Sequence, residues 1–130
     1  MLADDEAMVR AGLRLILESE PDIDVVGEAS NGIEALAAAT RLRPDVVLID
    51  VHMPRLDGLS AAHQLLVNDP GIKVVVLTTF NDGSYVNEAL RLGASGFLLK
   101  VAPPESLAEA VRVAARGDAL LDPLVTRRVI

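Results

Sequence analysis

Short apolar runs alternate along the chain with longer segments in which hydrophobic residues recur every three or four positions. This alternation predicts β-α-β units, a parallel sheet and a doubly wound α/β fold. Two of the runs, Val46–Ile49 and Val74–Leu77, are continuously apolar, as expected for central strands that helices cover on both faces. The predicted strands are Met1–Ala3, Ile23–Ala29, Val46–Ile49, Lys73–Thr78 and Gly96–Leu99.

A helix is predicted after each strand, from hydrophobic residues at helical spacing. The first two helices show a stripe of this kind, and the third and fourth show weaker patterns, with Gly93 closing the fourth. The stripes and ranges are Val9, Leu13, Ile16 and Leu17; Ile33, Leu36, Ala37 and Thr40; Leu59–Val67; and Tyr85–Leu92.

The fifth helix has the clearest boundaries. The pair Pro103-Pro104 precedes it, and Gly117 stands where a glycine is expected to end it. Residues 1–117 are therefore predicted to form one domain, and Asp118–Ile130, which a proline interrupts, indicates the start of a linker. The residues that share the face of this helix are Leu107, Ala110, Val111 and Ala114.

The first predicted strand is short for the centre of a doubly wound sheet, where strands usually run to five or six residues. We therefore expect residues upstream of Met1 to be missing from this sequence. The length of 130 residues fits one domain with one core. Because 51% of the residues are hydrophobic but only 2% aromatic, that core must be built from Leu, Val, Ile and Ala.

Composition also excludes several classes of function. No apolar run approaches the roughly 18 residues of a membrane span, and Met1–Asp5 lacks the basic start of a signal peptide, so a cytoplasmic location and no membrane contact are expected. The absence of cysteine rules out disulfides and thiolate chemistry. With a formal charge of -7 and scattered basic residues, this segment is not expected to bind nucleic acid by itself, and Arg127-Arg128 is interpreted as a solvated tail.

Polar residues follow several of the predicted strands at the point where each strand ends. In an open parallel sheet, ligands bind outside the carboxyl ends of the strands, so these side chains are expected to lie together. Three converging carboxylates would repel one another unless a cation were bound, and a hard ion such as Mg²⁺ suits oxygen ligands of this kind. The residues at these positions are Asp4, Asp5, Asp50, Thr78 and Lys100.

Asp50 is the candidate nucleophile, because a carboxylate can attack phosphorus and form an aspartyl phosphate. Such a transfer needs its charge neutralised, which a metal ion and an ammonium group can do. Lys100 fits the ammonium role: only Lys73 and Lys100 are lysine among 12 basic residues, so lysine here is informative. Thr78 offers a hydroxyl to a phosphoryl oxygen.

Each of these residues also has a plain structural interpretation. Asp4-Asp5 could cap a helix, Asp50 could end a strand in a turn, and Thr78 could be an ordinary β-branched strand residue. Lys100 could extend its charged end into solvent. Alternation along the last strand could turn the ring of Phe97 away from the core, although simple packing of that ring is equally consistent with the pattern.

At these residues the sequence resembles the receiver domains of two-component response regulators, in the NarL/FixJ-type subfamily whose output domain is a LuxR-type helix-turn-helix. The resemblance covers essentially the whole chain and implies a flavodoxin-like fold with strand order 2-1-3-4-5, for which a member of this family is a standard example. The motifs that carry it are Leu2–Asp5, Asp50–Pro54 with Asp57-Gly58, Val76–Phe80 and Gly93–Lys100.

The resemblance implies a role for each residue. Asp50 would accept the phosphoryl group, and Asp4, Asp5, Asp50 and the backbone carbonyl of His52 would hold Mg²⁺. Thr78 and Lys100 would bind the phosphoryl group, with Thr78 and Phe97 acting as the switch. The implied partners are a sensor histidine kinase, a second copy on activation, and DNA only through an output domain that this chain lacks.

The sequence departs from the family pattern in ways that limit the transfer. Phe97 has no hydroxyl, so only a change of packing could signal through it. His52 and Phe80 occupy positions that tune dephosphorylation in the family.

Two rival functions remain. A small Mg²⁺-dependent phosphatase would need a second acid-base group, for which His52 is the nearby candidate. A pseudo-receiver would keep the fold without phosphotransfer, which the five polar residues argue against. We therefore expect a regulatory domain and not an enzyme.

Overall fold

The computed structural model describes residues 1–79, 83–118 and 120–121. Within them a parallel sheet has the strand order β2-β1-β3-β4-β5-β6, so the predicted order of the first five strands is confirmed. Its strands are β1 (Leu2–Ala3), β2 (Glu28–Ala29), β3 (Val46–Asp50), β4 (Lys73–Thr78), β5 (Gly96–Leu99) and β6 (Leu120–Leu121). Its helices are α1 (Ala7–Glu18), α2 (Gly32–Leu42), α3 (Gly58–Asn68), α4 (Gly83–Arg91) and α5 (Pro104–Ala115).

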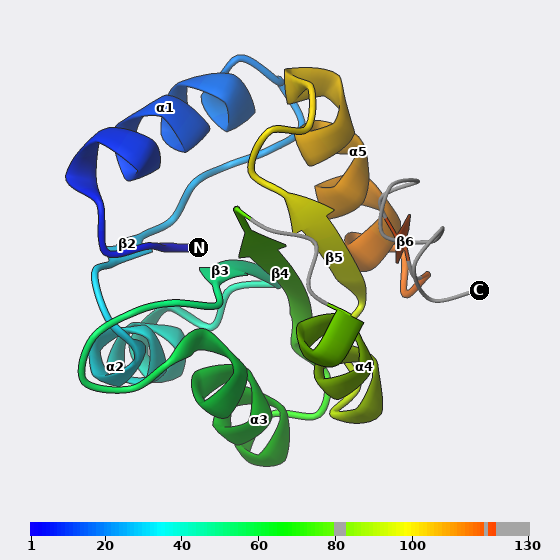
Figure 1. The fold of residues 1–130 in the computed structure, drawn as a ribbon. Helices are drawn as coiled ribbons and strands as arrows, with labels where there is room; N and C mark the ends of the chain where they lie inside the picture. The colour runs from blue at the N-terminus through cyan, green and yellow to red at the C-terminus, as the bar shows by residue number, and fades with distance from the viewer. Residues whose placement is uncertain (80–82, 119, 122–130) are drawn as a thin grey trace.

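The helices cover both faces of the sheet, as Figure 1 shows. One apolar cluster joins α1 and α5 to strand residues such as Leu48 and Leu77. The other joins α2, α3 and α4 to the alternate strand residues, among them Ile49 and Val76. Because successive side chains of a strand point to opposite faces, the continuously apolar β3 and β4 supply both clusters, which explains their composition.

Glycine ends two helices as the sequence predicts. Gly93 and Gly117 adopt positive φ angles of 95° and 86°, which a residue with a side chain rarely adopts. After α5 the amide of Asp118 donates to the carbonyl of Val113, and the amide of Gly117 donates to that of Ala114. This pair of hydrogen bonds satisfies the last carbonyls of the helix and turns the chain back towards the sheet.

The structure corrects the prediction for the face of α2. The proposed stripe was wrong at three of its four positions: Ile33 is 45% exposed, and Ala37 and Thr40 are also exposed. Leu36, the fourth, is partly buried and packs against the core. The buried face is Ala35, Ala38 and Ala39, which packs in the cluster with α3. Because most positions of α2 are apolar, periodicity did not define a face, and close packing against the neighbouring elements favoured the small residues.

Two strand predictions also change. The strand expected at Ile23–Ala29 is reduced to β2, because β1 offers only Leu2 and Ala3 as partners for Glu28 and Ala29. A further two-residue strand, β6, pairs in parallel with β5 inside the segment that was expected to begin a linker. Most of Asp118–Ile130 lies outside the described residues, so the linker remains a prediction.

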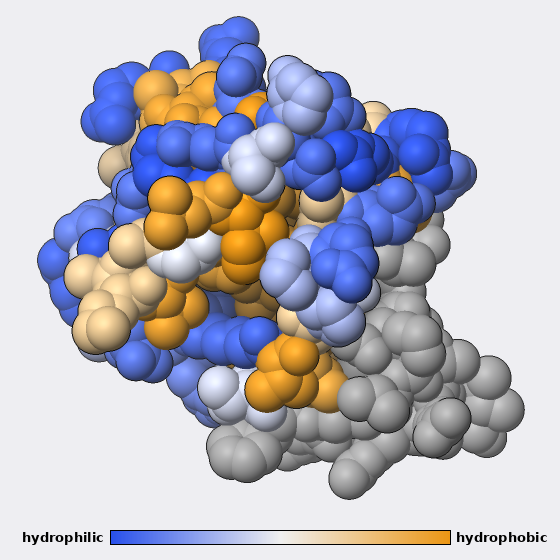
Figure 2. All heavy atoms as spheres, turned by 90° about the horizontal axis from the view of Figure 1, so that it is seen from above, coloured by the Kyte–Doolittle hydropathy of each residue, from blue (hydrophilic) through white to orange (hydrophobic). Residues whose placement is uncertain are grey.

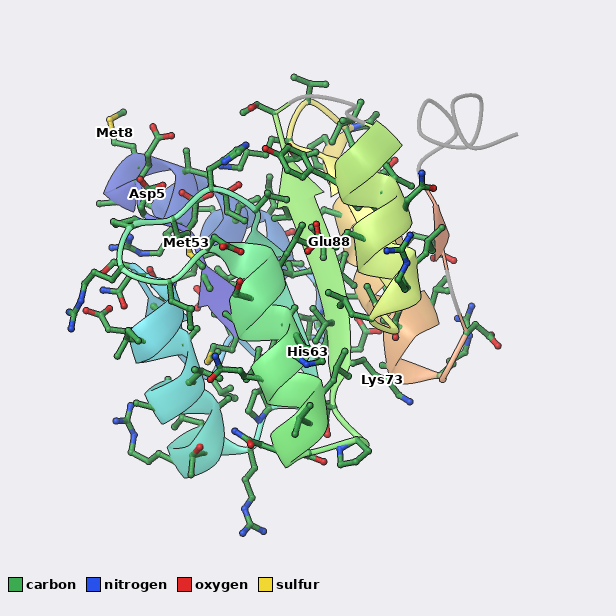
Figure 3. The ribbon with its side chains drawn as sticks, turned by 60° about the horizontal axis from the view of Figure 1, so that its bottom comes forward. Asp5, Met8, Met53, His63, Lys73 and Glu88 are labelled. Carbon is green, nitrogen blue, oxygen red and sulfur yellow. The ribbon has the colours of Figure 1, made fainter. Side chains whose placement is uncertain are left out.

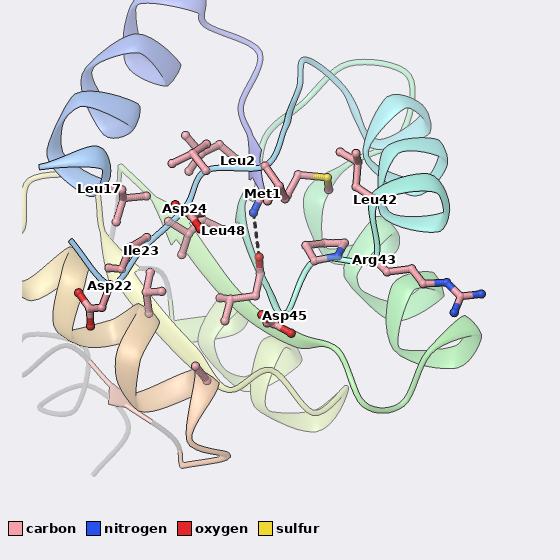
Figure 4. Close-up of a pocket in the computed structure, with 16 residues that line it drawn as sticks. Met1, Leu2, Leu17, Asp22, Ile23, Asp24, Leu42, Arg43, Asp45 and Leu48 are labelled. Atoms are coloured by element: carbon pink, nitrogen blue, oxygen red, sulfur yellow. Dashed lines mark hydrogen bonds between the residues drawn. The ribbon is translucent and has the colours of Figure 1, made fainter. Parts of the chain in front are cut away.

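A cavity of about 290 Å³ lies at the amino end of β1 (Figure 4). Leu17, Ile23 and Val111 line it beside the first residue of the chain. The Met1 amino group donates to the carbonyl of Val46 over 2.9 Å and is buried. Burial lowers the pKa of this amino group from 8.0 to about 6. Within the described part of the chain, no helix is long and apolar enough to cross a bilayer.

This lowered pKa predicts a pH-dependent stability for the 130-residue chain. Between pH 6 and pH 8 the unfolded chain binds the proton that the folded chain releases, so the free energy of unfolding should rise over this range by about 2 kcal/mol. Urea unfolding at pH 6, 7 and 8 measures this. A chain acetylated at the Met1 nitrogen is the control and should lack the increment. Parallel pH curves for the two chains would contradict the prediction.

Candidate functional site

Four strands bring their carboxyl ends to one edge of the sheet, and the candidate residues lie there. Asp50 and Thr78 are the last residues of β3 and β4, while Asp4 and Lys100 directly follow β1 and β5. The parallel register places these ends side by side, as the sequence predicts. Asp5 lies next to Asp4 at the start of α1, close to Met8 in Figure 3.

Asp4 is completely buried and is held from several sides. Its amide donates to the carbonyl of Ala29 over 3.0 Å, and its Oδ1 accepts from the amide of Glu6 over 2.9 Å. Its Oδ2 lies 2.6 Å from Lys100 Nζ as an ion pair but accepts no hydrogen bond of good geometry. This buried oxygen therefore keeps capacity for another electropositive partner.

Asp50 is 4% exposed, and its Oδ2 lies 3.1 Å from Lys100 Nζ. Burial raises the pKa of the Asp50 carboxyl, and the nearby Asp4 adds to the rise. Lys100 and a hydrogen bond from the backbone of His52 act in the opposite direction without cancelling the rise. The cause is the cost of placing an ionised carboxylate away from water beside another carboxylate.

Lys100 is the one cation that contacts both buried carboxylates within the described residues. Its burial lowers its pKa, but the close contacts with the negatively charged Asp4 and Asp50 outweigh burial, and the net pKa is raised. The ammonium therefore stays protonated between the two acids. Its sequence-based interpretation as a solvent-directed lysine is wrong for this structure, since its charged end turns inward to the carboxylates.

The three acids form a group that fits a divalent cation. Asp4, Asp5 and Asp50 each offer one carboxylate oxygen, and these oxygens lie within 4.8 Å of one another. One ammonium cannot neutralise three carboxylates, and the Lys100 ion pair is the one contact that the described residues give Asp4 Oδ2. Mg²⁺ prefers oxygen ligands, and carboxylates with uncompensated negative charge suit it. The position of the His52 carbonyl as a further ligand remains a prediction.

Thr78 and Phe97 are both fully buried. The carbonyl of Thr78 accepts from the amide of Lys100 over 2.7 Å, which ties the ends of β4 and β5 together. Phe97 lies in the apolar cluster with Val86 and Ala89 of α4. The idea that its ring points away from the core was wrong, because the α4 side of the sheet is also covered. Its role as a switch is not tested by this arrangement.

Sequence reasoning missed contacts around the site. Arg10 of α1 donates Nη1 to the Asp4 carbonyl over 2.6 Å, and no local pattern separates this arginine from others on exposed helix positions. The rings of His52 and Tyr85 meet edge to face with centroids 5.2 Å apart, which links the loop after β3 to α4. Phe80 lies outside the described residues.

The fold, the strand-end acids and the inward lysine define a receiver-type domain, and comparison with known proteins identifies the family. The sequence profile of the response regulator receiver domain matches residues 1–112, so the chain belongs to this family. The family assignment, the LuxR-type resemblance and the fold expected from it are confirmed.

Its relatives are bacterial transcriptional regulators. The chain is 43% identical over 129 residues to the uncharacterized transcriptional regulatory protein YxjL of Bacillus subtilis, covering 99% of this chain and 59% of that protein. It is 39% identical to the transcriptional regulatory protein DegU of Brevibacillus brevis, covering 100% of this chain and 55% of that protein. The chain thus spans little more than half the length of these relatives.

Solved structures agree in fold. A LuxR-family response regulator from Aurantimonas sp. has a TM-score of 0.95 at 28% identity, with 99% of this chain and 92% of that chain covered. The receiver domain of the response regulator NarL from Mycobacterium tuberculosis has a TM-score of 0.85 at 33% identity, with 89% and 94% covered.

Gly58 gives a test of how the loop after β3 supports Asp50. A Cβ at Gly58 would lie 1.8 Å from the backbone oxygen of Asp50. We expect Gly58→Ala to lower the free energy of unfolding by about 2–3 kcal/mol, because rigid backbone must move. In the matched control Gly12→Ala, the new Cβ meets nothing within 4 Å inside α1, and stability should rise by up to about 1 kcal/mol. Urea unfolding measures the stability of both variants. Equal free energies of unfolding for Gly58→Ala and the wild type would contradict the prediction.

Proposed function

We propose that this receiver domain accepts a phosphoryl group on Asp50 from a phosphohistidine of a sensor histidine kinase and changes conformation in response. The observation that carries the proposal is the buried Asp50 carboxylate at the end of β3, which pairs with Lys100 and lies beside Asp4, whose Oδ2 accepts no hydrogen bond of good geometry from the described residues. This arrangement supports the proposal, because groups around Asp50 would be able to stabilise negative charge on the transferring oxygens.

The reaction would be an in-line displacement on phosphorus. An oxygen of Asp50 forms the new P–O bond, and the bond from phosphorus to the histidine nitrogen breaks, with the electron pair leaving on the imidazole. Lys100, which already contacts Asp50 Oδ2, is placed to bind a phosphoryl oxygen. Mg²⁺ held by Asp4, Asp5, Asp50 and the His52 carbonyl would neutralise charge on the phosphoryl group.

Exposed hydrophobic side chains near the acidic edge support docking of a protein phosphodonor. Met8 is 88% exposed three residues after Asp5, Leu15 is 73% exposed two turns further along α1, and Val101 is 77% exposed next to Lys100. Figure 2 looks onto the side of the molecule where α1 lies in Figure 1, and hydrophobic side chains reach the surface there among hydrophilic ones. Single exposed hydrophobic residues are normal on protein surfaces, so these three support docking only through their placement on α1 and beside Lys100.

The phosphoryl group would bias an equilibrium between two conformations. The hydroxyl of Thr78 would move towards it, and Phe97 would repack against α4, which shares the cluster with Phe97 through Val86 and Ala89. The altered surface would control homodimerisation and, in a longer protein, a DNA-binding output domain. We also propose that residues 118–130 begin the linker to that domain.

Intact-protein mass after incubation with Mg²⁺ and acetyl phosphate tests the acceptor. The wild-type chain should gain one phosphoryl group, and Asp50→Asn should gain none, because the amide is not a nucleophile of comparable strength. Omission of Mg²⁺ should reduce the gain by an order of magnitude or more. Equal labelling of wild type and Asp50→Asn would exclude Asp50 as acceptor, and no labelling of the wild type would favour an interaction module without phosphotransfer.

Thr78→Val separates acceptance of the phosphoryl group from the response to it. The side chain keeps its shape but loses its hydroxyl, so labelling by acetyl phosphate should stay within about threefold of wild type. The conformational response, followed as chemical-shift changes of α4 amides and as dimer formation in light scattering, should be lost. A full conformational response in this variant would show that the Thr78 hydroxyl is not required for the switch.

A further inference from the structure

Arg10 connects the acidic site to β2 through two hydrogen bonds. Its Nη1 donates to the carbonyl of Asp4 over 2.6 Å, and its Nε donates to Glu28 Oε1 over 3.0 Å. The side chain is 18% exposed, so most of its length is held against the protein. The planar guanidinium fork fixes the directions of both hydrogen bonds, whereas the donors of an ammonium on a flexible stem can rotate.

The Asp4 carbonyl belongs to the peptide that leads into Asp5. Because a peptide group is planar, fixing that carbonyl also fixes the nitrogen and Cα of Asp5. The Asp4 amide on the other side of the residue is held by Ala29, the neighbour of Glu28 in β2. The two residues of β2 therefore hold both ends of the Asp4 backbone, one directly and one through Arg10.

Asp5 depends on this backbone support. Its carboxylate makes no hydrogen bond or ion pair with the described residues, and the residue is exposed. It nevertheless lies close enough to Asp4 and Asp50 to complete the three-carboxylate group. The backbone consequently sets where the Asp5 side chain starts, and no side-chain contact with the described residues holds it further.

We propose that Arg10 is a positioning residue for divalent-cation binding: held by Glu28, it fixes the Asp4–Asp5 peptide so that the Asp5 carboxylate faces the other two acids. This inference rests on the proposed function, which makes the three acids a Mg²⁺ site. Arg10 itself does not touch the ion. Removal of a group that hydrogen-bonds to a metal ligand and orients it commonly lowers metal affinity by about ten- to a hundredfold.

Arg14 supplies a matched control on the same helix. It donates to Glu28 Oε2 and Glu18 Oε1, each over 2.7 Å, but makes no contact with Asp4. Arg10→Gln and Arg14→Gln each remove one positive charge near the acids. Charge alone would leave Mg²⁺ binding unchanged or make it tighter in both variants, because a repelling cation is removed. Loss of positioning would weaken Mg²⁺ binding, and it would do so in Arg10→Gln but not in Arg14→Gln.

The experiment is calorimetric titration of the unphosphorylated chain with MgCl₂ at constant ionic strength. Arg10→Gln should raise the dissociation constant about tenfold, and Arg14→Gln should leave it unchanged or slightly lower. Arg10→Lys keeps the charge but lacks the planar fork that fixes both hydrogen bonds, so this variant should also bind Mg²⁺ more weakly than wild type. Urea unfolding of each variant checks that it is folded. If Arg10→Gln does not fold, the titration of Arg10→Lys tests the inference in its place.

The outcomes separate the inference from the function on which it rests. Weaker Mg²⁺ binding in the Arg10 variants but not in Arg14→Gln supports positioning by Arg10. An affinity in the Arg10 variants equal to that of wild type, or higher in step with Arg14→Gln, overturns it and leaves the proposed function intact. A wild-type chain that binds no Mg²⁺ would instead count against the proposed function.

Discussion

Two buried carboxylates share one ammonium group at the edge of the sheet, and the remaining features of the site follow from that constraint. Asp4 and Asp50 both contact Lys100, but a third acid, Asp5, stands within reach of them, so negative charge exceeds positive charge. Burial and like charge together raise the pKa of Asp50. A divalent cation would reduce this excess of negative charge, and a phosphoryl group bound to Asp50 would increase it.

The surrounding fold holds these charges in place through backbone contacts. The register of the parallel strands aligns the ends of β1, β3, β4 and β5, and the Thr78 carbonyl joins the last two. Gly58 allows the start of α3 to approach the backbone of Asp50 more closely than any side chain would permit. Arg10 and Glu28 support the Asp4–Asp5 peptide from the opposite side. Side chains with little intrinsic affinity for one another are thus kept together by the sheet and its loops.

Local patterns predicted most elements of the fold but failed where several arrangements were equally compatible with them. The aliphatic runs of β3 and β4 and the proline and glycine boundaries of α5 have strong local signals, and the structure contains them. In α2 almost every residue is apolar, so the buried Ala35, Ala38 and Ala39 could not be distinguished from Ile33. The length of β2 depended on how many residues of β1 were present to pair with it.

The sequence by itself determined the α/β class, the family and the chemical identity of the strand-end residues, because these depend on residue types at short and regular spacings. Only the tertiary structure decided that Phe97 is buried, that Lys100 turns inward and that Arg10 holds the Asp4 carbonyl. Each of these depends on contacts between residues that are far apart in the sequence or on different elements. Their geometry depends on how closely the helices pack on the sheet, which no local pattern encodes.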